Sequence, residues 1–383
     1  MADSLRCPRS ETDEGKFMRT SFSLDHRDGL ARAGVVTTAR GTFTTPTFMP
    51  VGTRGAVKHL SSVDMEDLGA QVILANNYHL MLRPGADIVE SLGGIHAMAD
   101  WHGHTLTDSG GYQVFSLEPK ISDEGAVFKS VYDGDRIMMT PEGAVDTQIS
   151  IGADIQMVLD VCAALPSSDA IIREALDRTV LWAGRAREHF LAHPTASQKQ
   201  AQFGIVQGGL DLAMRKESAE RTIEIGFDGY AVGGLSVGEH RSEWHEPLLA
   251  ATGALPVDQP RYFMGLGDPA GIVDAVARGI DMFDCVLPTR LARHGTLLTN
   301  EGRVNLTRRE FATDDQPIDP EGPASRWSRG YLRHLLAVKE PTAARILTMH
   351  NLWWLLRFVD DMRTAIAEER FEAFAADVYE RWG

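Results

Sequence analysis

The chain has 383 residues, of which 43% are hydrophobic, so it is long enough for one α/β barrel or for two ordinary domains. Its formal net charge of −15 at pH 7 argues against diffuse binding to nucleic acid, because phosphate groups are repelled everywhere except at a locally basic face. Residues 290–345 are one such region, with ten Lys and Arg residues against seven Asp and Glu. A mixed solvated surface explains so small an excess equally well.

Three cysteines, Cys7, Cys162 and Cys285, lie far apart in the chain. Their spacing indicates reduced thiols in a cytoplasmic protein, with no disulfide framework and no cysteine metal cluster. The N-terminus lacks the apolar core of a signal peptide, and no later run approaches membrane-spanning length, so we expect no membrane partner. Residues 1–19 are predicted to be a disordered tail and residues 20–383 a single domain.

From Ser21 to Thr45 apolar and polar residues alternate around the turn signal Asp28-Gly29, which predicts an antiparallel hairpin ahead of the main fold. After it, short apolar runs repeatedly end in a polar residue or glycine, and most are followed by a helical segment. The predicted strands are Thr47–Pro50, Val72–Ala75, Thr105–Thr107, Ile155–Leu159, Phe203–Val206, Tyr230–Val232, Tyr262–Met264 and Met282–Phe283.

Eight strands that alternate with helices predict an α/β fold of the (β/α)8 TIM barrel type, whose active site lies at the C-terminal ends of the strands. A doubly wound open sheet is the rival architecture. It favours one strong glycine fingerprint after an early strand, and the sequence contains none.

The pattern changes beyond Arg290. Residues 291–350 are predicted to be an insertion, whose first part is rich in turn signals such as Asn300-Glu301-Gly302. Two helical segments are expected at the C-terminal end, Ser328–Glu340 and about Thr342–Trp382. The barrel is therefore expected to carry a C-terminal insertion and helical subdomain.

Asp284 lies inside an apolar run that reads as a strand buried on both faces. Burying an unpaired carboxylate is costly, so this residue is either ion-paired scaffold or a reactive group. In a barrel, Asp108, Asp160 and Asp284 end three different strands and face one pocket, which suits acid–base and nucleophilic chemistry at a glycosidic carbon. A lone divalent ion is a second interpretation, although no His accompanies the carboxylates at ligand spacing.

Two loops and one amide suggest a flat ligand. In Thr107-Asp-Ser-Gly-Gly-Tyr-Gln113 the glycines let the backbone approach a ligand and Tyr112 offers an aromatic face, although a tight structural loop looks the same. Gly229-Tyr-Ala-Val-Gly-Gly-Leu-Ser-Val-Gly-Glu239 exposes backbone N–H and C=O groups, which suits a base edge. Gln207 ends a strand and either reads a base as donor and acceptor or is a buried structural amide.

Four motifs, in this order, resemble the bacterial tRNA-guanine transglycosylases: the two loops just quoted, Phe203-Gly-Ile-Val-Gln-Gly208 between them, and Phe283-Asp-Cys-Val-Leu-Pro-Thr-Arg290 after them. The similarity runs from about Phe22 to the C-terminus. It implies a (β/α)8 barrel that exchanges the wobble guanine of certain tRNAs for a 7-deazaguanine base, the first step of queuosine formation in the tRNA. It also implies a homodimeric pentosyltransferase that needs no cofactor and forms a covalent glycosyl-enzyme intermediate.

Carried over by position, the resemblance assigns Asp284 as the nucleophile that attacks the ribose C1′ and Asp108 as the general acid/base. Base-binding and RNA-binding roles fall on further positions. These are Asp160, Gln207, Gly234 and Leu235 as hydrogen-bonding groups, Tyr112 and Met264 on the two faces of the base, and Arg290 and Arg293 as RNA-binding residues.

Two further positions bear on which base is used. Val237 and Cys162 stand where queuine-using relatives have smaller or different residues, and Val237 is expected to narrow the pocket beside the 7-substituent. The preferred base is therefore expected to be the small precursor 7-aminomethyl-7-deazaguanine.

The insertion departs from the family pattern. In most relatives Cys-x-Cys-x-x-Cys and a later His hold a structural zinc, whereas here the matching stretch Glu321–Trp327 has no cysteine and only His350 remains, so no metal is expected. Two other functions stay open: a paralogous transglycosylase that acts on DNA or another RNA, and a non-catalytic partner subunit that only docks RNA. The three retained carboxylates disfavour the last, because a binding module needs no buried nucleophile.

Overall fold

The computed structural model describes residues 20–383, so the tail predicted for residues 1–19 lies outside the described residues. Its central sheet has the strand order β4-β14-β13-β12-β11-β10-β6-β5, and all neighbouring strands run parallel. Val51 pairs in parallel with Leu74, and the N–H of Gly52 donates to the Leu74 carbonyl at 2.7 Å, which joins the two outer strands. The predicted (β/α)8 barrel is confirmed.

Each of the eight predicted strands has its counterpart in the barrel. Six of them, β4, β5, β10, β11, β12 and β13, are buried at every residue, as near-continuous apolar runs predict for parallel strands covered on both faces. The barrel strands are β4 (Thr47–Pro50), β5 (Val72–Asn76), β6 (His104–Asp108), β10 (Ile155–Met157), β11 (Ala201–Val206), β12 (Gly229–Val232), β13 (Arg261–Phe263) and β14 (Met282–Cys285).

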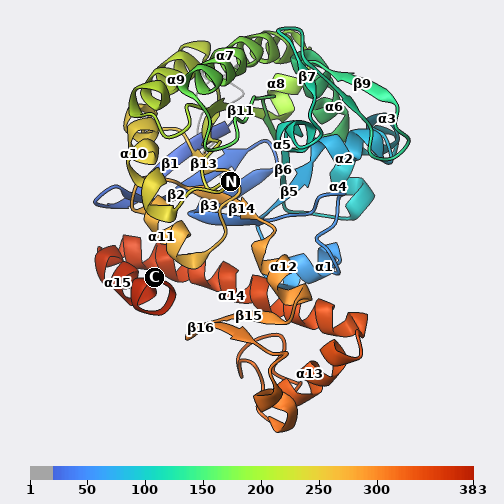
Figure 1. The fold of residues 1–383 in the computed structure, drawn as a ribbon, viewed down its shortest axis with the longest axis vertical. Helices are drawn as coiled ribbons and strands as arrows, with labels where there is room; N and C mark the ends of the chain where they lie inside the picture. The colour runs from blue at the N-terminus through green and yellow to red at the C-terminus, as the bar shows by residue number, and fades with distance from the viewer. Residues whose placement is uncertain (1–19) are drawn as a thin grey trace, which may run out of the picture.

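Helices enclose the strands in Figure 1, and the long helix α7 crosses the top of the barrel in that view. Two of these helices begin with a side-chain cap, since the side chains of Thr140 and Asp268 accept from the N–H groups of Gly143 and Gly271, and a proline follows each cap. The helices up to the end of the barrel are α1 (Ser62–Asp67), α2 (Asn77–Leu82), α3 (Ala86–Ser91), α4 (Gly94–Ala99), α5 (Gly111–Phe115), α6 (Pro141–Ile151), α7 (Asp169–Ala192), α8 (Ala196–Lys199), α9 (Leu212–Ile225), η1 (Arg241–Trp244, a 3-10 turn), α10 (His245–Ala254), α11 (Pro269–Val276) and α12 (Leu287–Arg293).

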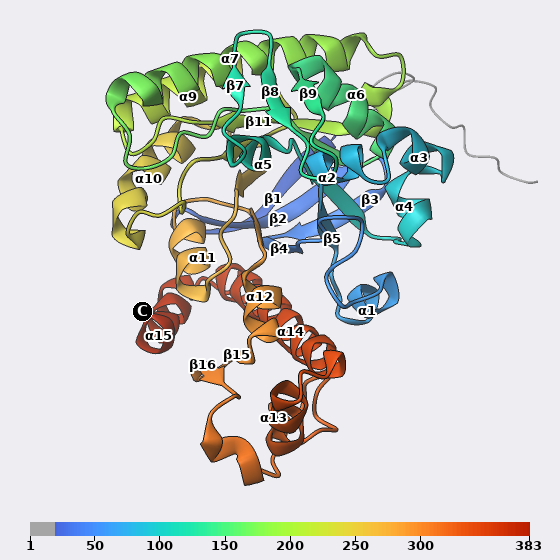
Figure 2. The same ribbon diagram turned by 45° about the vertical axis from the view of Figure 1, so that its right-hand side comes forward.

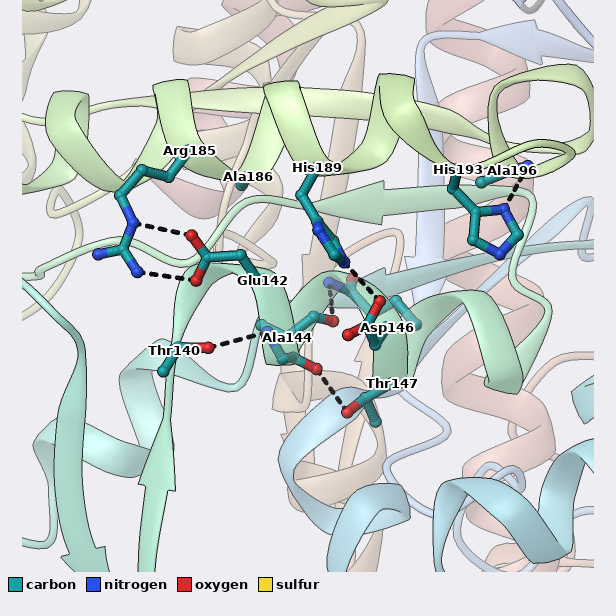
Figure 3. Close-up of polar contacts among 12 residues, drawn as sticks. Thr140, Glu142, Ala144, Asp146, Thr147, Arg185, Ala186, His189, His193 and Ala196 are labelled. Carbon is teal, nitrogen blue, oxygen red and sulfur yellow. Dashed lines mark hydrogen bonds and ion pairs between the residues drawn. The ribbon is translucent and has the colours of Figure 1, made fainter.

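The outer helices α6 and α7 are joined by charged contacts, which Figure 3 shows in close-up. Arg185 of α7 binds both carboxylate oxygens of Glu142 at 2.8 Å, and one turn further on His189 Nε2 lies 2.6 Å from Asp146 Oδ1. These pairs fix the register of two helices whose apolar faces pack on the barrel.

The prediction of a two-stranded hairpin at the N-terminus missed a third strand. β1 (Thr20–Asp28) and β2 (Ala31–Thr38) form it as expected, but β3 (Gly41–Thr45) adds a third antiparallel strand, because a second tight turn follows Thr38. A further antiparallel sheet stands between β6 and α6 and was not predicted. It consists of β7 (Lys120–Ile121), β8 (Ala126–Lys129) and β9 (Arg136–Met139).

The C-terminal part projects from the barrel in Figures 1 and 2. It contains the hairpin β15 (Thr296–Thr299) and β16 (Gly302–Asn305), which turns where the sequence predicted, then the 3-10 turn η2 (Arg309–Thr313) and α13 (Arg329–Ala337). Leu297, Ile318, Leu332 and other apolar side chains give this part a small core of its own.

The single helix predicted from Thr342 to Trp382 is wrong, because the chain forms α14 (Pro341–Ala367) and α15 (Phe371–Trp382). Glu369 adopts a left-handed φ of 54°, which ends the first helix and reverses the chain. The reversal brings Trp382 to 5.3 Å from Trp354, between ring centroids. The reversed chain thereby buries apolar rings between the two helices.

Helix α14 crosses below the barrel and connects it to the projecting part (Figure 1). Near its start, Arg345 donates to both oxygens of Asp64, each at 2.6 Å, and so ties α14 to α1. This contact helps to hold the pKa of Asp64 down at about 2. No helix within residues 20–383 is long and apolar enough to cross a membrane.

Candidate active site

The C-terminal ends of the barrel strands open into one pocket, whose cavity volume is about 330 Å³. Its wall contains most of the residues singled out from the sequence. They are Asp108, Tyr112, Asp160, Cys162, Gly234, Leu235, Val237, Met264 and Asp284. Gln207 is not part of the wall, but it is bonded directly to Asp160 behind it.

Asp284 is held by one of its two oxygens. Oδ1 accepts from the Tyr262 hydroxyl at 2.5 Å and from the Gly265 N–H at 2.7 Å, while Oδ2 has no partner among residues 20–383. Burial raises the pKa of Asp284, and the bonds from Tyr262 and Gly265 oppose that rise. No cation pairs with it in the described chain, so the ion-paired scaffold interpretation fails and a fixed carboxylate with one free oxygen remains.

Asp108 lies beside Asn76, because β5 and β6 pair in a register that sets the two residues side by side. Its Oδ2 accepts from Asn76 Nδ2 at 2.7 Å, and its Oδ1 accepts from the N–H groups of Asn77 and Gly110 at 3.2 and 3.0 Å. The other end of the Asn76 amide accepts from the His79 N–H, which fixes the amide orientation.

The same carboxyl is poised to exchange a proton near neutral pH. Burial raises the pKa of Asp108 to about 7, the negative charge of Asp284 adds to the rise, and the bonds from Asn77, Asn76 and Gly110 oppose it. A group with this pKa is present in both forms at pH 7, as general acid–base catalysis requires.

Asp160 is 5% exposed and accepts from Gln207 Nε2 at 2.7 Å. Burial raises the pKa of Asp160 to about 6, against the bonds from Gln207 and Ser109. It therefore remains mostly ionised at pH 7 and can accept hydrogen bonds from a ligand. The Gln207 amide is buried, but it is more than a structural group, because it orients the Asp160 carboxylate in the pocket.

The two glycines after Asp108, Gly110 and Gly111, leave no room for a larger residue. A Cβ on Gly111 would stand 2.9 Å from Asp160 Oδ1, and one on Gly110, where φ is +82°, would stand 2.7 Å from the Cβ of Tyr78. Tyr112 follows them and is 65% exposed at the mouth of the pocket. The loop is therefore tight and also presents a ring to the opening.

Two residues that hold the carboxylates, Asn76 and Tyr262, were not singled out from the sequence. Asn76 was visible as the polar residue that ends a predicted strand. Tyr262 stands two residues before Met264, so the twofold repeat of a strand places both side chains on one face. No sequence signal shows that its hydroxyl reaches a strand neighbour.

Arg290 and Arg293 lie outside the pocket wall, on α12, which begins three residues after Asp284. Neither forms an ion pair within the described residues. Arg293 lies close enough to His59 to help lower the pKa of that ring, after burial and Lys58. These groups form a basic edge beside the strand that carries Asp284.

A second basic group was missed in the sequence. The guanidinium carbons of Arg54 and Arg83 lie 5.6 and 4.3 Å from the centre of the Tyr132 ring, and both arginines are exposed and unpaired in the described chain. Arg54 adjoins Thr53, which lines the pocket. This basic group could be found only from the tertiary structure, because its three residues are far apart in sequence.

Within residues 20–383, no three His, Cys, Asp or Glu side chains gather as metal ligands would. Cys162 lines the pocket, and burial raises the pKa of its thiol to about 12, so the thiol is neutral at pH 7.

The geometry predicts how Asp108 titrates. In carboxyl ¹³C NMR of the protein, we expect a midpoint of about 7 for Asp108. Asp284→Asn is expected to lower that midpoint, because it removes a neighbouring negative charge, and Asn76→Ala to raise it, because it removes a donor to the ionised form. Asp146→Asn on the outer surface serves as the control and leaves it unchanged. A midpoint near the ordinary value of aspartate would contradict this account.

We compared the sequence of this chain with known protein families and proteins. The sequence profile of the family described as "Queuine tRNA-ribosyltransferase" matches residues 27–383. A queuine tRNA-ribosyltransferase of Solidesulfovibrio magneticus is 48% identical over 363 residues, which cover 94% of this chain and 96% of the relative. That of Caulobacter vibrioides is 46% identical, with 93% and 96% covered, and that of Herpetosiphon aurantiacus is 45% identical, with 94% and 92% covered.

These matches span the barrel, the pocket and the C-terminal part together. They confirm the resemblance drawn from the four motifs. The chain belongs to the queuine tRNA-ribosyltransferase family.

Proposed function

We propose that this protein is a tRNA-guanine transglycosylase that exchanges the wobble guanine of its target tRNAs for 7-aminomethyl-7-deazaguanine. The observation that carries the proposal is the pair of carboxylates in one pocket. Asp284 is fixed through one oxygen and leaves the other free, and the pKa of Asp108 is raised to about 7. Family membership and the names of the relatives support the same reaction.

In the first step, Asp284 Oδ2 attacks the ribose C1′ of the wobble nucleotide. The bond from C1′ to the guanine nitrogen breaks, its electron pair goes to the base, and Asp108 gives a proton to the departing guanine. The ribose is then held as an ester of Asp284. Fixing Oδ1 through Tyr262 and Gly265 favours this attack, because the free oxygen needs no reorientation.

In the second step, the incoming base gives its ring N–H proton to Asp108 and attacks C1′. The ester bond breaks and Asp284 leaves as a carboxylate. Two displacements return the original configuration at C1′. A single group performs both proton transfers, which is consistent with a pKa of about 7 for Asp108.

The pocket recognises the base through the groups around these carboxylates. Asp160 and Gln207 bind its polar edge together with the backbone of Gly234 and Leu235, while Tyr112 and Met264 contact its faces. Outside the pocket, the RNA backbone binds the basic residues described above, Arg290 and Arg293 together with Arg54 and Arg83. The homodimer and the cytoplasmic location expected from the sequence stay predictions.

The covalent step predicts the effect of Asp284→Asn. An amide cannot form the ester, so exchange of labelled guanine into tRNA should fall by about a thousandfold or more. The protein–RNA adduct should disappear from a denaturing gel, while tRNA binding persists. Asp146→Asn, which alters only the outer pair with His189 shown in Figure 3, should keep full activity. Substantial turnover by Asp284→Asn would mean that another group is the nucleophile.

The wall of the pocket predicts which base is used. Val237 is 36% exposed and lines the pocket, so its branched side chain limits the room for a substituent. In direct competition, 7-aminomethyl-7-deazaguanine should be incorporated in preference to queuine, and Val237→Gly should reduce that preference by about tenfold. Val257→Gly, at an exposed valine outside the pocket, is the control. A wild-type preference for queuine would overturn this assignment.

We also propose that the insertion folds without zinc. Residues 291–350 contain no cysteine. His350 is buried, with Nε2 2.9 Å from the Leu298 carbonyl oxygen and Nδ1 without a partner within residues 20–383, and burial lowers its pKa to about 4. One neutral imidazole does not make a tetrahedral zinc site. The small apolar core, which includes Ala324 in the stretch that replaces the cysteine motif, stabilises the insertion instead.

Zinc content and stability test this directly. The purified protein should contain substoichiometric zinc by elemental analysis, and its melting temperature should not change when a strong chelator is added. A relative that carries the cysteine motif, treated in the same way, is the control and should lose stability. Stoichiometric zinc, or a large fall in melting temperature on chelation, would show that other ligands replace the cysteines.

A further inference from the structure

Arg215 of α9 is fully buried and forms no ion pair within the described residues. Its guanidinium instead donates to four backbone carbonyls. Nε binds Gly209 O at 2.7 Å, Nη1 binds Val206 O at 3.1 Å and Gly233 O at 2.7 Å, and Nη2 binds Gly234 O at 3.1 Å. A buried cation that no carboxylate neutralises is costly, so these dipoles must stabilise it.

The charge persists at neutral pH. Burial lowers the pKa of Arg215 to about 9, and the nearby Cys162 and Glu239 oppose that fall. The side chain is therefore a full positive charge directly behind the loop that follows β12. None of the reaction steps described above uses it.

Two of the four carbonyls belong to the pocket wall. Gly233, Gly234 and Leu235 all line the pocket, yet the carbonyls of the two glycines are both engaged by Arg215. Gly234 has a left-handed φ of +66°, a conformation that glycine adopts without strain. Both carbonyls are directed at the guanidinium behind the turn, so the N–H on the opposite side of each trans peptide points away from it.

Unlike the carbonyls, two N–H groups of the same turn have no hydrogen-bond partner within residues 20–383. Gly233 N–H donates to Val206 O at 3.1 Å, but the N–H groups of Gly234 and Leu235 have no acceptor among residues 20–383. Peptide units at Gly233 and Gly234 therefore offer donors rather than acceptors to the pocket. A donor here matches an oxo group on the ligand and opposes an amino group.

The turn also connects to the base-binding carboxylate. A Cβ on Gly234 would lie 2.4 Å from Gln207 Oε1, and one on Gly233 would lie 2.8 Å from Gln207 Nε2. The Gln207 amide thus packs directly against both glycines while Nε2 donates to Asp160. Arg215, the glycine pair, Gln207 and Asp160 form one contiguous set of contacts.

We propose that Arg215 is a positioning residue that makes the Gly233–Gly234 turn a hydrogen-bond donor surface, and so selects a purine-type base with a 6-oxo group over one with a 6-amino group. The inference rests on the proposed function for the identity of the base. It adds a specificity role for a side chain that does not line the pocket.

Arg261 provides a matched control. It is 7% exposed and also donates to backbone carbonyls, those of Leu255, Pro256 and Gly279, but it begins β13 at the end of the barrel opposite the pocket. If buried arginines act only by stabilising loops, Arg215→Lys and Arg261→Lys should lower the melting temperature without changing base selectivity. A lysine cannot reproduce the fork that binds four carbonyls.

The experiment measures the dissociation constants of guanine and 2,6-diaminopurine by calorimetry, since the two differ by an oxo or an amino group at position 6. The wild type should prefer guanine by about a hundredfold or more. Arg215→Lys should reduce that ratio by about tenfold, whereas Arg261→Lys should keep it. An unchanged ratio in Arg215→Lys, or an equal loss in Arg261→Lys, would overturn the proposal.

If Arg215→Lys does not fold, judged by its melting curve, Arg215→Gln is measured in the same way. The wild-type ratio decides the donor assignment even without a variant, because equal binding of the two bases contradicts it. Labelled-guanine exchange into tRNA is recorded in parallel. A wild type that selects guanine but transfers none to tRNA would refute the proposed function and leave the role of Arg215 standing.

Discussion

Removing a carboxylate from water raises its pKa, and hydrogen bonds and cations oppose that rise; two aspartates at β14 differ in which of these they have. Asp281, just before the strand, is fully buried and its pKa is raised to about 6, although it binds Arg32 Nε at 3.1 Å and the Arg261 N–H at 2.8 Å. Asp284, three residues later, has no cation and only two donors on one oxygen. The first carboxylate holds the N-terminal β-sheet on the barrel. The second keeps a free oxygen in the pocket, where a bound base and ribose can reach it.

The same contrast extends around the barrel, whose N-terminal strand ends serve stability and whose C-terminal ends serve chemistry. Parallel register makes this possible, because it sets Asn76 beside Asp108 and so gives a neutral amide the position that an ion pair would otherwise occupy. An amide orients the carboxyl and opposes the rise of its pKa only partly, whereas a full positive charge at the same place would favour the ionised form more strongly. The low charge of the groups around these carboxylates is therefore part of the mechanism.

The barrel and its carboxylates could be predicted from the sequence, because both follow from patterns in short stretches of the chain. Each apolar run that ends in a polar residue identifies a strand and its functional end, as Asp108 and Asp284 illustrate. The contacts that complete the site are not local. Tyr262 reaches a neighbouring strand and Arg215 reaches the turn at Gly234 from a helix, so neither is visible before the chain is folded.

The predicted helix boundaries in the C-terminal part were wrong for a related reason. Residues 368–370 are charged but contain neither glycine nor proline, so the sequence gives no strong helix stop there. The reversed chain is favoured by contacts between the two helices, such as those of Trp382 with Trp354 and of Phe374 with Phe358. The third N-terminal strand and the small sheet β7-β8-β9 are similar cases. Their short antiparallel pairings depend on turns whose residues give weak signals.

A chain with a net charge of −15 must still accept a polyanion, and the distribution of ion pairs gives a physical answer. On the outer helices arginines are matched: Arg185 with Glu142, as Figure 3 shows, and Arg221 with Asp177. At the basic groups near the pocket mouth, Arg54, Arg290 and Arg293 form no ion pair within residues 20–383, and Arg83 lies near the Asp133 carboxylate without forming one. Salt screens distant acidic groups over about 8 Å at physiological ionic strength. A phosphate that reaches this edge therefore experiences mainly the unpaired arginines, and the acidic remainder of the surface repels RNA bound anywhere else.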